Sequence, residues 1–121
     1  YDAAGWKEGP GGFGTRGTPG AVVRTEWNTA DIWLRREFTL PGSGDLYLSL
    51  HHDEDAEVYL NGVLAAKVQG FVTGYEDVAI NEAARKALKP GGKNVIAIHC
   101  HQTTGGQYID AGLIELKERR P

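Results

Sequence analysis

The sequence is poor in sulfur-containing residues and in long apolar stretches. It has no methionine and a single cysteine, Cys100. One cysteine cannot form an internal disulfide, so the cysteine content does not assign the protein to an oxidising or a reducing compartment. No apolar run approaches the roughly 18 residues that a membrane-spanning helix needs, so we expect no membrane partner. Because the sequence begins at Tyr1 and lacks methionine, we expect residues 1–121 to be a single domain excised from a longer, multidomain chain.

An excess of positive charge is also missing. The sequence has 13 lysine and arginine residues against 16 aspartate and glutamate residues, for a net charge of -3. Basic residues gather only near the C-terminal end, at Lys117, Arg119 and Arg120. Domains that bind nucleic acid carry a basic patch over their binding face. The charge balance therefore predicts no nucleic-acid partner.

Alternation of apolar and polar residues is the main pattern of the sequence. In "LYLSLHH", residues 46–52, every second residue is leucine until the histidines begin. A period of two predicts a strand with one buried face. In the strand predicted over residues 32–40, Ile32, Leu34, Phe38 and Leu40 share the apolar side, and we expect the large Trp33 to be buried as well. Further strands are predicted over residues 56–60, 63–68, 95–101 and 108–116.

Turn and helix signals complete the prediction of the fold. Asn61 and Gly62 tolerate the positive φ values of a two-residue type I′ turn, so residues 56–68 should form a hairpin. "NEAARKAL", residues 81–88, is the only helical pattern, and "KPGGKN" stops it. Roughly seven to nine short strands and one helical segment predict an all-β fold, an antiparallel β-sandwich with one short helix.

The order of these signals is similar to that of a known family. The motifs are "WLRREF" at 33–38, "AEVYLNG" at 56–62 and "LKPGGKNVI" at 88–96. In this order they resemble the galactose-binding-domain-like jelly roll, which includes the sugar-binding domain of family 2 glycoside hydrolases. Related accessory domains occur in secreted bacterial hydrolases, including some glutaminase-type amidases. The resemblance implies a non-catalytic accessory domain, a secreted or periplasmic location, glycan binding through loops at one end, and a neighbouring catalytic domain as partner. It leaves a structural calcium as a possible cofactor.

The segment "HHDED", residues 51–55, contains five ionisable residues. Its three carboxylates could supply oxygen ligands to Ca²⁺, which takes about 6–8 of them. In an extended strand, however, His51 and His52 point to opposite faces and cannot hold one ion without a bend. We expect these residues to end the strand and shape the loop rim, and contact with a ligand or an ion remains the alternative.

A second polar segment, "HCHQTTGGQY", covers residues 99–108. His99 and His101 share one face of an extended strand, an arrangement that can present two nitrogens to a metal. A third ligand would have to come from the 51–55 segment, so a calcium or zinc site is one open reading. The others are hydrogen bonding to a ligand and ordinary packing. The candidate metal ligands are Asp53, Asp55, His99 and His101.

Carbohydrate binding also requires exposed aromatic rings. The candidates are Trp6, Trp27, Phe71, Tyr75 and Tyr108, with packing as the expected role of both tryptophans. The polar loop beside Tyr108 offers amides and hydroxyls that suit the hydroxyl groups of a sugar. We therefore predict weak glycan binding at one end of the sandwich. The predicted ligand-binding residues are His52, Asp53, Asp55, Tyr75, His101, Gln102, Gln107 and Tyr108.

Two further hypotheses are kept beside glycan binding. The domain could be a purely structural module that packs on a catalytic domain through an apolar patch containing Trp6, Phe13 or Trp27. It could also be a metal-binding module. Catalysis by the domain itself is not expected, because Ser43 and Ser49 lie outside any Gly-x-Ser-x-Gly motif and alternation turns the Cys100 thiol away from the neighbouring histidines.

Overall fold

The structure is a computed structural model that describes residues 11–18, 20–39, 45–102 and 106–116. Predictions that concern Trp6, Leu40, Ser43, residues 103–105 or residues 117–121 lie outside these ranges. Within the described ranges the chain forms nine strands and one helix. In chain order they are β1 (Phe13–Gly14), β2 (Thr25–Glu26), β3 (Asp31–Thr39), β4 (Asp45–Asp53), β5 (Asp55–Leu60), β6 (Val63–Val68), β7 (Glu76–Ala79), α1 (Glu82–Ala87), β8 (Lys93–His101) and β9 (Tyr108–Leu116).

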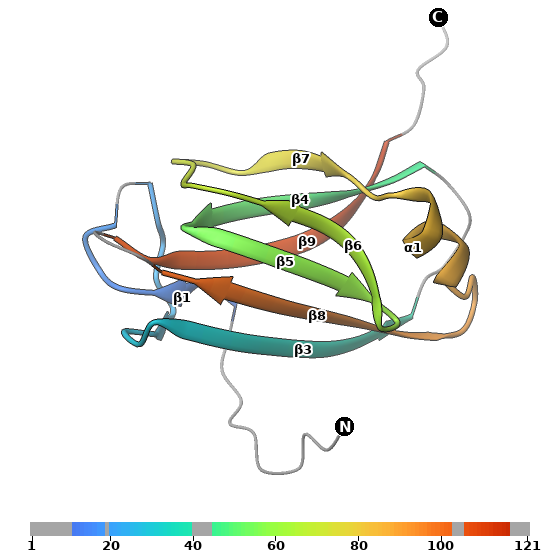
Figure 1. Cartoon of the computed structure of the whole chain (residues 1–121), viewed down its shortest axis with the longest axis horizontal. Helices are drawn as coiled ribbons and strands as arrows, with labels where there is room; N and C mark the ends of the chain where they lie inside the picture. Colours follow the sequence, from blue (N-terminus) through green and yellow to red (C-terminus); the bar gives the residue numbers. More distant parts are fainter. Residues whose placement is uncertain (1–10, 19, 40–44, 103–105, 117–121) are drawn as a thin grey trace, which may run out of the picture.

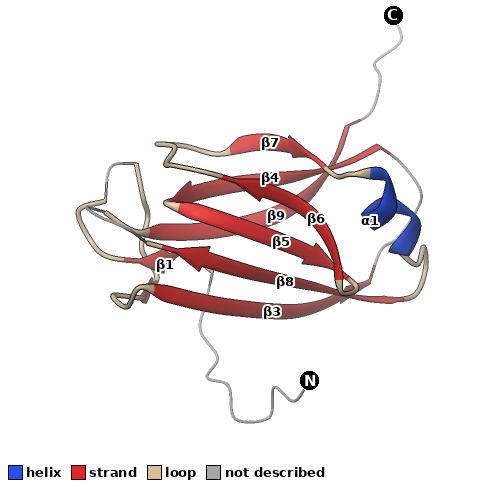
Figure 2. Ribbon diagram, viewed as in Figure 1, coloured by secondary structure: helices blue, strands red, loops and turns tan. Residues whose placement is uncertain are grey.

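The strands form two sheets that face each other (Figures 1 and 2). One sheet has the strand order β2-β1-β9-β4-β7, and the other has the order β3-β8-β5-β6. All strand pairs are antiparallel except the short β1–β2 pair, which is parallel. The predicted all-β sandwich with one short helix is therefore confirmed. No helix in the described ranges is long and apolar enough to cross a membrane.

The core lies between the sheets and follows directly from the alternation of side chains. Leu48 and Leu50 on β4 face Val58 and Leu60 on β5, and all four side chains are fully buried. Each such side chain contributes roughly 1.5–3 kcal/mol relative to an exposed one. The other buried apolar residues of the cluster are Trp27, Leu46, Ala56, Ala65, Ile80, Ala84, Ile98, Cys100 and Ile109. The sequence prediction of a packing role for Trp27 agrees with this position.

The predicted hairpin joins β5 to β6. Asn61 has φ 50° and Gly62 has φ 80°, so both central residues occupy the left-handed region that a type I′ turn requires. The Asn61 side chain also accepts a hydrogen bond from Val95 N at 2.8 Å and donates one to Ala87 O at 2.7 Å. The turn is thereby bonded to β8 and to the end of α1.

Helix α1 covers the same end of the sandwich as this hairpin (Figure 1). Its N-cap is Asn81, whose side chain accepts a hydrogen bond from Ala84 N at 2.9 Å. A capping bond of this kind stabilises a helix by about 1 kcal/mol. The short helix buries Ala84 against the core. The loops at the opposite end of the sandwich carry most of the predicted site residues.

The prediction for Trp33 was wrong, because its side chain is 56% exposed. Ile32 and Leu34 on either side of it point inward and pack on the core. Strict alternation along β3 therefore places Trp33 on the outer face of the four-stranded sheet. The expectation of burial rested on the position of Trp33 within a strand, and the period of that strand decides the direction of the side chain.

Candidate functional site

The predicted site residues come together at one end of the sandwich, which we call the loop end. His101, the last residue of β8, lies opposite Asp31 of β3 and Asp55 of β5. Asp53, the last residue of β4, lies opposite Tyr108 of β9 and forms an isolated bridge with Phe71. Segments that are far apart in the sequence are thus neighbours here. The register of the paired strands therefore places these residues at the same end of the sandwich.

The two histidines of "HHDED" are buried near the end of β4. Only 2% of His51 and 3% of His52 is exposed. Nδ1 of His52 lies 2.8 Å from Glu54 O and 3.1 Å from Gly70 O. Because both partners are carbonyl oxygens, Nδ1 must carry the proton. His52 therefore connects the end of β4 to the chain before Phe71, and its position is structural.

His51 lies on the other face of β4, as the alternation predicted. Its ring packs against Tyr108 and edge-on against Tyr75, with centroid distances of 4.6 and 5.4 Å. Burial lowers the pKa of His51. Its Nε2 atom is buried and has no hydrogen-bond partner among the described residues. The neutral ring acts as a packed support beneath Tyr75.

The carboxylates of the segment do not converge. Asp53 is buried, and burial raises its pKa, with a further increase from Glu54 and an opposing effect of His52. Asp55 instead accepts a hydrogen bond from Gly70 N at 2.7 Å. Each carboxylate thus has different surroundings, which does not fit a shared calcium ion.

His99 and His101 do share a face, and both contact Asp31. Asp31 Oδ1 lies 2.7 Å from His99 Nε2 and 2.8 Å from His101 Nδ1. These hydrogen bonds lower the pKa of Asp31. Both hydrogen bonds involve the same oxygen, so these two nitrogens are directed at Asp31 and not at a shared metal position. In the ranges that the structure describes, no group of three or more His, Cys, Asp or Glu residues is placed to hold a metal ion.

The predicted metal set of Asp53, Asp55, His99 and His101 is therefore not assembled. Both histidines instead contact Asp31, which is not among the metal ligands predicted from the sequence. The signal that could have identified it is its position at the start of a strand that pairs with the His-x-His strand. Cys100, between the two histidines, is fully buried, and burial raises the pKa of its thiol to about 12. It packs as an apolar residue, as predicted.

The predicted ligand residues Gln107 and Tyr108 are also buried. Gln107 Nε2 donates to Thr29 O at 2.9 Å, and the Tyr108 hydroxyl donates to Val22 O at 2.9 Å. Burial raises the pKa of Tyr108. Both side chains tie the start of β9 to the loops around β2. Gln102 is half-buried, and its backbone N–H donates to Ala30 O at 2.7 Å.

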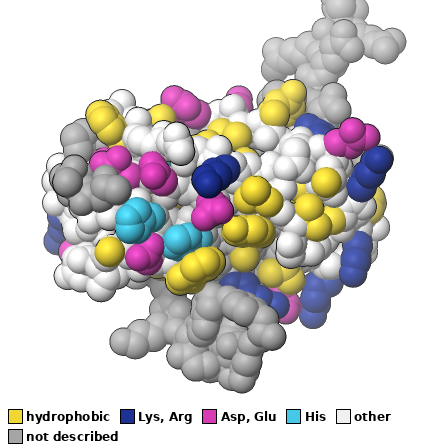
Figure 3. All heavy atoms as spheres, viewed as in Figure 1, with side chains coloured by type: hydrophobic (Ala, Val, Ile, Leu, Met, Phe, Trp, Pro, Cys, Tyr) yellow, Lys and Arg dark blue, Asp and Glu magenta, His cyan; other side chains and the backbone are white. Residues whose placement is uncertain are grey.

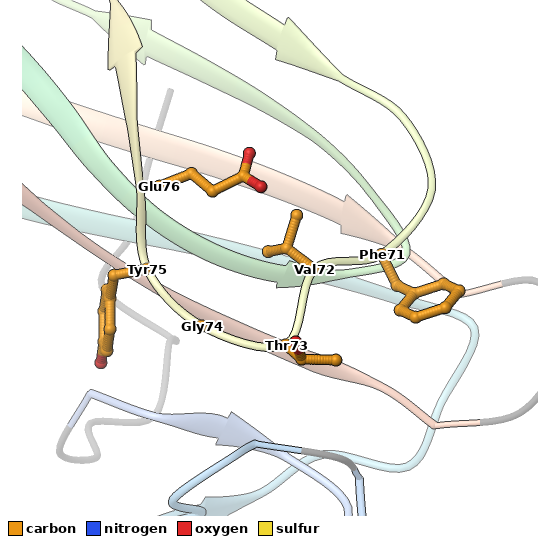
Figure 4. Close-up of a pocket in the computed structure, with 6 residues that line it drawn as sticks. All are labelled: Phe71, Val72, Thr73, Gly74, Tyr75 and Glu76. Atoms are coloured by element: carbon orange, nitrogen blue, oxygen red, sulfur yellow. The ribbon is translucent and has the colours of Figure 1, made fainter.

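Tyr75 is the predicted site residue that projects furthest into solvent. Its side chain is 57% exposed, and the side chain of Phe71 is 62% exposed. The two residues stand at opposite ends of a loop that leads into β7 (Figure 4). The loop encloses an open depression of about 350 Å³ lined by Phe71, Val72, Thr73, Gly74, Tyr75 and Glu76.

Tyr75 is held in place from two sides. Its hydroxyl donates a hydrogen bond to Asp110 Oδ2, which raises the pKa of the phenol. Its ring edge packs on the buried His51. The ring therefore needs little reordering when a flat ligand lies against it.

A second exposed aromatic lies on the outer face of the four-stranded sheet. Trp33 stacks on His99, with ring centroids 4.0 Å apart and ring planes 7° apart. Figure 3 shows hydrophobic, histidine and acidic side chains next to one another on this face. The loop end thus has two exposed aromatic surfaces, one beside β7 and one on β3 and β8.

Among solved structures, a similar one supports the fold. The chain matches no protein-family profile and no curated protein sequence. Its structure is similar to part of a β-D-glucuronidase of Dictyoglomus thermophilum, with a TM-score of 0.51 and 22% identity. The match covers 63% of this chain and only 13% of that enzyme. At this identity the similarity shows a shared β-sandwich fold, and the galactose-binding assignment stays a prediction.

Proposed function

We propose that this chain is a non-catalytic accessory domain of a carbohydrate-degrading enzyme and that its loop end binds a glycan weakly. The observation that carries the proposal is the exposed pair Phe71 and Tyr75 on either side of the open depression. The glycan and a neighbouring catalytic domain are the proposed partners. The secreted or periplasmic location implied by the family resemblance belongs to the same proposal.

The chemistry of the depression suits a sugar ring. A pyranose has apolar C–H faces and a rim of hydroxyls, so it can lie on an aromatic ring and still form hydrogen bonds. Tyr75 supplies a fixed ring, while Asp110 and Glu76 supply carboxylate oxygens close to it. The depression is open and short, which favours weak binding of a surface chain unit over deep enclosure of a small molecule.

The size of the structural match supports an accessory role. The similar segment is a small part of a much longer glycosidase, as expected for one domain of a multidomain enzyme. The buried Cys100 thiol, whose pKa is raised to about 12, is unsuited to act as a nucleophile. Both points support a domain that positions a substrate for chemistry performed elsewhere.

The test is binding of the 121-residue chain to soluble polysaccharides by affinity electrophoresis and titration calorimetry. We expect Tyr75→Ala and Phe71→Ala each to weaken binding by about tenfold, as for truncation of an aromatic contact. Leu64→Ala is the matched control, because Leu64 is also an exposed apolar side chain but lies on β6. Equal binding by Tyr75→Ala, Phe71→Ala and the unaltered chain would place the site elsewhere. No binding to any polysaccharide would refute the proposal.

A structural module that packs on a catalytic domain is the second candidate. The exposed Val22, Phe71 and Tyr75 favour it, because all three project near the loop end. The patch predicted from the sequence, with Trp6, Phe13 or Trp27, stays a prediction for Trp6. Trp6 lies outside the described residues, Trp27 is buried, and Phe13 is half-buried against the core.

A further inference from the structure

Trp33 is a large aromatic residue that is 56% exposed on the outer face of the four-stranded sheet. It lies on β3, the edge strand of the four-stranded sheet, directly opposite His99 of β8. One face of its indole ring is covered by the parallel His99 ring at 4.0 Å. Because β3 is the edge strand, no further strand among the described residues pairs beyond it. With this exposed fraction, part of the Trp33 side chain is accessible to a ligand.

The geometry around Trp33 is held by a network of hydrogen bonds. His99 Nε2 lies 2.7 Å from Asp31 Oδ1, and His99 Nδ1 lies 3.4 Å from Glu57 Oε1. The Tyr59 hydroxyl donates to Glu57 Oε2 at 3.1 Å. The short contact with Asp31 orients the imidazole, and the imidazole lies parallel to the ring of Trp33. Stacking of a ligand here therefore costs little side-chain conformational entropy.

Polar groups lie next to the His99 ring on which Trp33 stacks. Asp31 and His101 are both partly exposed and are bonded to each other through Oδ1 and Nδ1. Within the described residues, Asp31 Oδ2 and His101 Nε2 make no hydrogen bond, so both are available to hydroxyl groups. The surface thus joins an apolar ring face to hydrogen-bonding groups.

We propose that the surface formed by Trp33, His99, Asp31 and His101 is a second carbohydrate-binding site, which takes a neutral pyranose ring. Two carboxylates, Asp31 and Glu57, flank His99 and disfavour an anionic sugar by like-charge repulsion. The core of a protein interface is depleted of charged side chains, whereas Asp31 and Glu57 lie against the His99 ring on which Trp33 stacks. A neutral sugar satisfies both conditions, since it brings an apolar face and hydroxyl donors.

This site is separate from the depression beside β7. Trp33 belongs to the four-stranded sheet, whereas the Tyr75 loop leads into β7, which pairs with β4 in the five-stranded sheet. The inference goes beyond the proposed loop site, and the two sites can fail independently. Two weak sites on one domain would allow one long polysaccharide to be held at two points, which increases its overall affinity.

The experiment compares four forms of the 121-residue chain: unaltered, Trp33→Ala, Tyr75→Ala and the double variant. The probes are soluble neutral polysaccharides (β-glucan, galactan, mannan) and polygalacturonate as the anionic polymer. Titration calorimetry should give roughly tenfold weaker binding of a neutral polymer for Trp33→Ala and a further loss in the double variant. Trp33→Tyr, which keeps an aromatic ring, should retain most of the affinity. Leu64→Ala controls for removal of an exposed apolar side chain from the same sheet.

The outcomes of this experiment test the Trp33 surface and the Tyr75 loop separately. Unchanged affinity of Trp33→Ala would show that the surface binds no sugar, while a loss in Tyr75→Ala alone would keep the proposed function. If only Trp33→Ala lowers the affinity for the polysaccharide, the Trp33 surface is supported and the proposed site at Tyr75 is refuted. Stronger binding of polygalacturonate than of the neutral polymers would contradict the predicted ligand class. A chain that self-associates through Trp33, with unaltered sugar binding in Trp33→Ala, would make the surface a protein contact.

Discussion

Asn61 and Asn94 are hydrogen-bonded to each other through their side chains, with 2.9 Å between Asn61 Nδ2 and Asn94 Oδ1. Asn94 is fully buried, and its Oδ1 also accepts a bond from Lys89 N at 2.8 Å. Its Nδ2 donates to the carbonyl oxygens of Lys89 and Gly92, each at 3.1 Å. One amide thus joins the hairpin turn, the segment after α1 and the start of β8 at the end opposite the proposed glycan site.

Replacing Asn94 by alanine should destabilise the domain. The change removes the partner of Lys89 N, while the Lys89 carbonyl keeps its hydrogen bond from Gly92 N at 3.0 Å. It also removes the side-chain hydrogen bond to Asn61, and a polar group that loses its partner costs about 1–3 kcal/mol. We expect the free energy of unfolding, measured by urea denaturation, to fall by roughly 2–5 kcal/mol. Asn28→Ala is the control, because Asn28 is exposed and the change should cost less than about 0.5 kcal/mol. An equal effect of the two changes would contradict this role of Asn94.

The close approach of Gly20 to the Tyr75 loop gives a second prediction. A Cβ atom at Gly20 would lie 2.0 Å from Thr73 O, whereas one at Gly17 would meet nothing within 4 Å. Both glycines have positive φ, 77° and 91°, so alanine at either position costs about 1–2 kcal/mol for the backbone conformation.

Gly20→Ala should therefore lower the melting temperature more than Gly17→Ala does. It should also weaken polysaccharide binding, because the clash displaces the loop between Phe71 and Tyr75. Calorimetry measures both effects on the same samples. If the two variants melt at the same temperature, the contact between Gly20 and Thr73 is not a constraint on the loop.

The buried carboxyl of Asp53 predicts a pH-dependent effect on stability. Burial raises the pKa of this group in the folded protein, so the folded form holds the proton more tightly than the unfolded form does. The protonated carboxyl therefore stabilises the fold at a pH below its unfolded-state pKa of about 3.9. This contribution is lost as the pH rises through the higher pKa of the folded state. Asp53→Asn should thus raise the melting temperature at pH 7.

At pH 3, where the carboxyl is protonated in both states, Asp53→Asn and the unaltered chain should melt at nearly the same temperature. Thermal unfolding followed by circular dichroism at pH 3 to 7 measures the difference. A lower melting temperature for Asp53→Asn at pH 7 would mean that the charged carboxylate is stabilised by a partner, and the assignment of burial as the dominant effect would be wrong.

The single thiol gives a fourth prediction, on reactivity. Cys100 is fully buried, and its pKa is raised to about 12, so very little thiolate is present at pH 8. Iodoacetamide should modify Cys100 slowly in the folded domain and rapidly in urea. A Leu64→Cys variant carries an additional, exposed thiol, and one of its two cysteines should react at once. Rapid modification of Cys100 in the folded chain would show that the core opens readily.

Local elements were well predicted from the sequence. The alternating leucines of β4, the Asn61-Gly62 turn and the Asn81-capped helix each depend on side chains and backbone within a few residues. Periodicity and φ preferences are local properties, and they are present in the unfolded chain as well as in the folded one. For this reason the sandwich class could be predicted before the pairing of the strands was known.

The candidate site was predicted less well, because burial depends on distant segments. The hydroxyl of Tyr108 donates a hydrogen bond to the carbonyl of Val22, and the side-chain amide of Gln107 donates one to the carbonyl of Thr29. No pattern within a few residues of the sequence predicts these contacts. The partnership of His99 and His101 with Asp31 likewise depends on the register of β3 against β8, which alternation alone does not specify.

The sequence by itself determined which residues alternate, where the chain turns and which polar residues end the strands. Only the tertiary structure decided which of those polar side chains reach solvent. His51, His52 and Asp53 are buried, and His51 and His52 contact segments far away in the sequence. Trp33 on the outer face of its sheet and Tyr75 in the loop before β7 are instead more than half exposed. Exposure is a property of the packed assembly of strands and loops, and a single strand's pattern indicates only the two directions in which its side chains point.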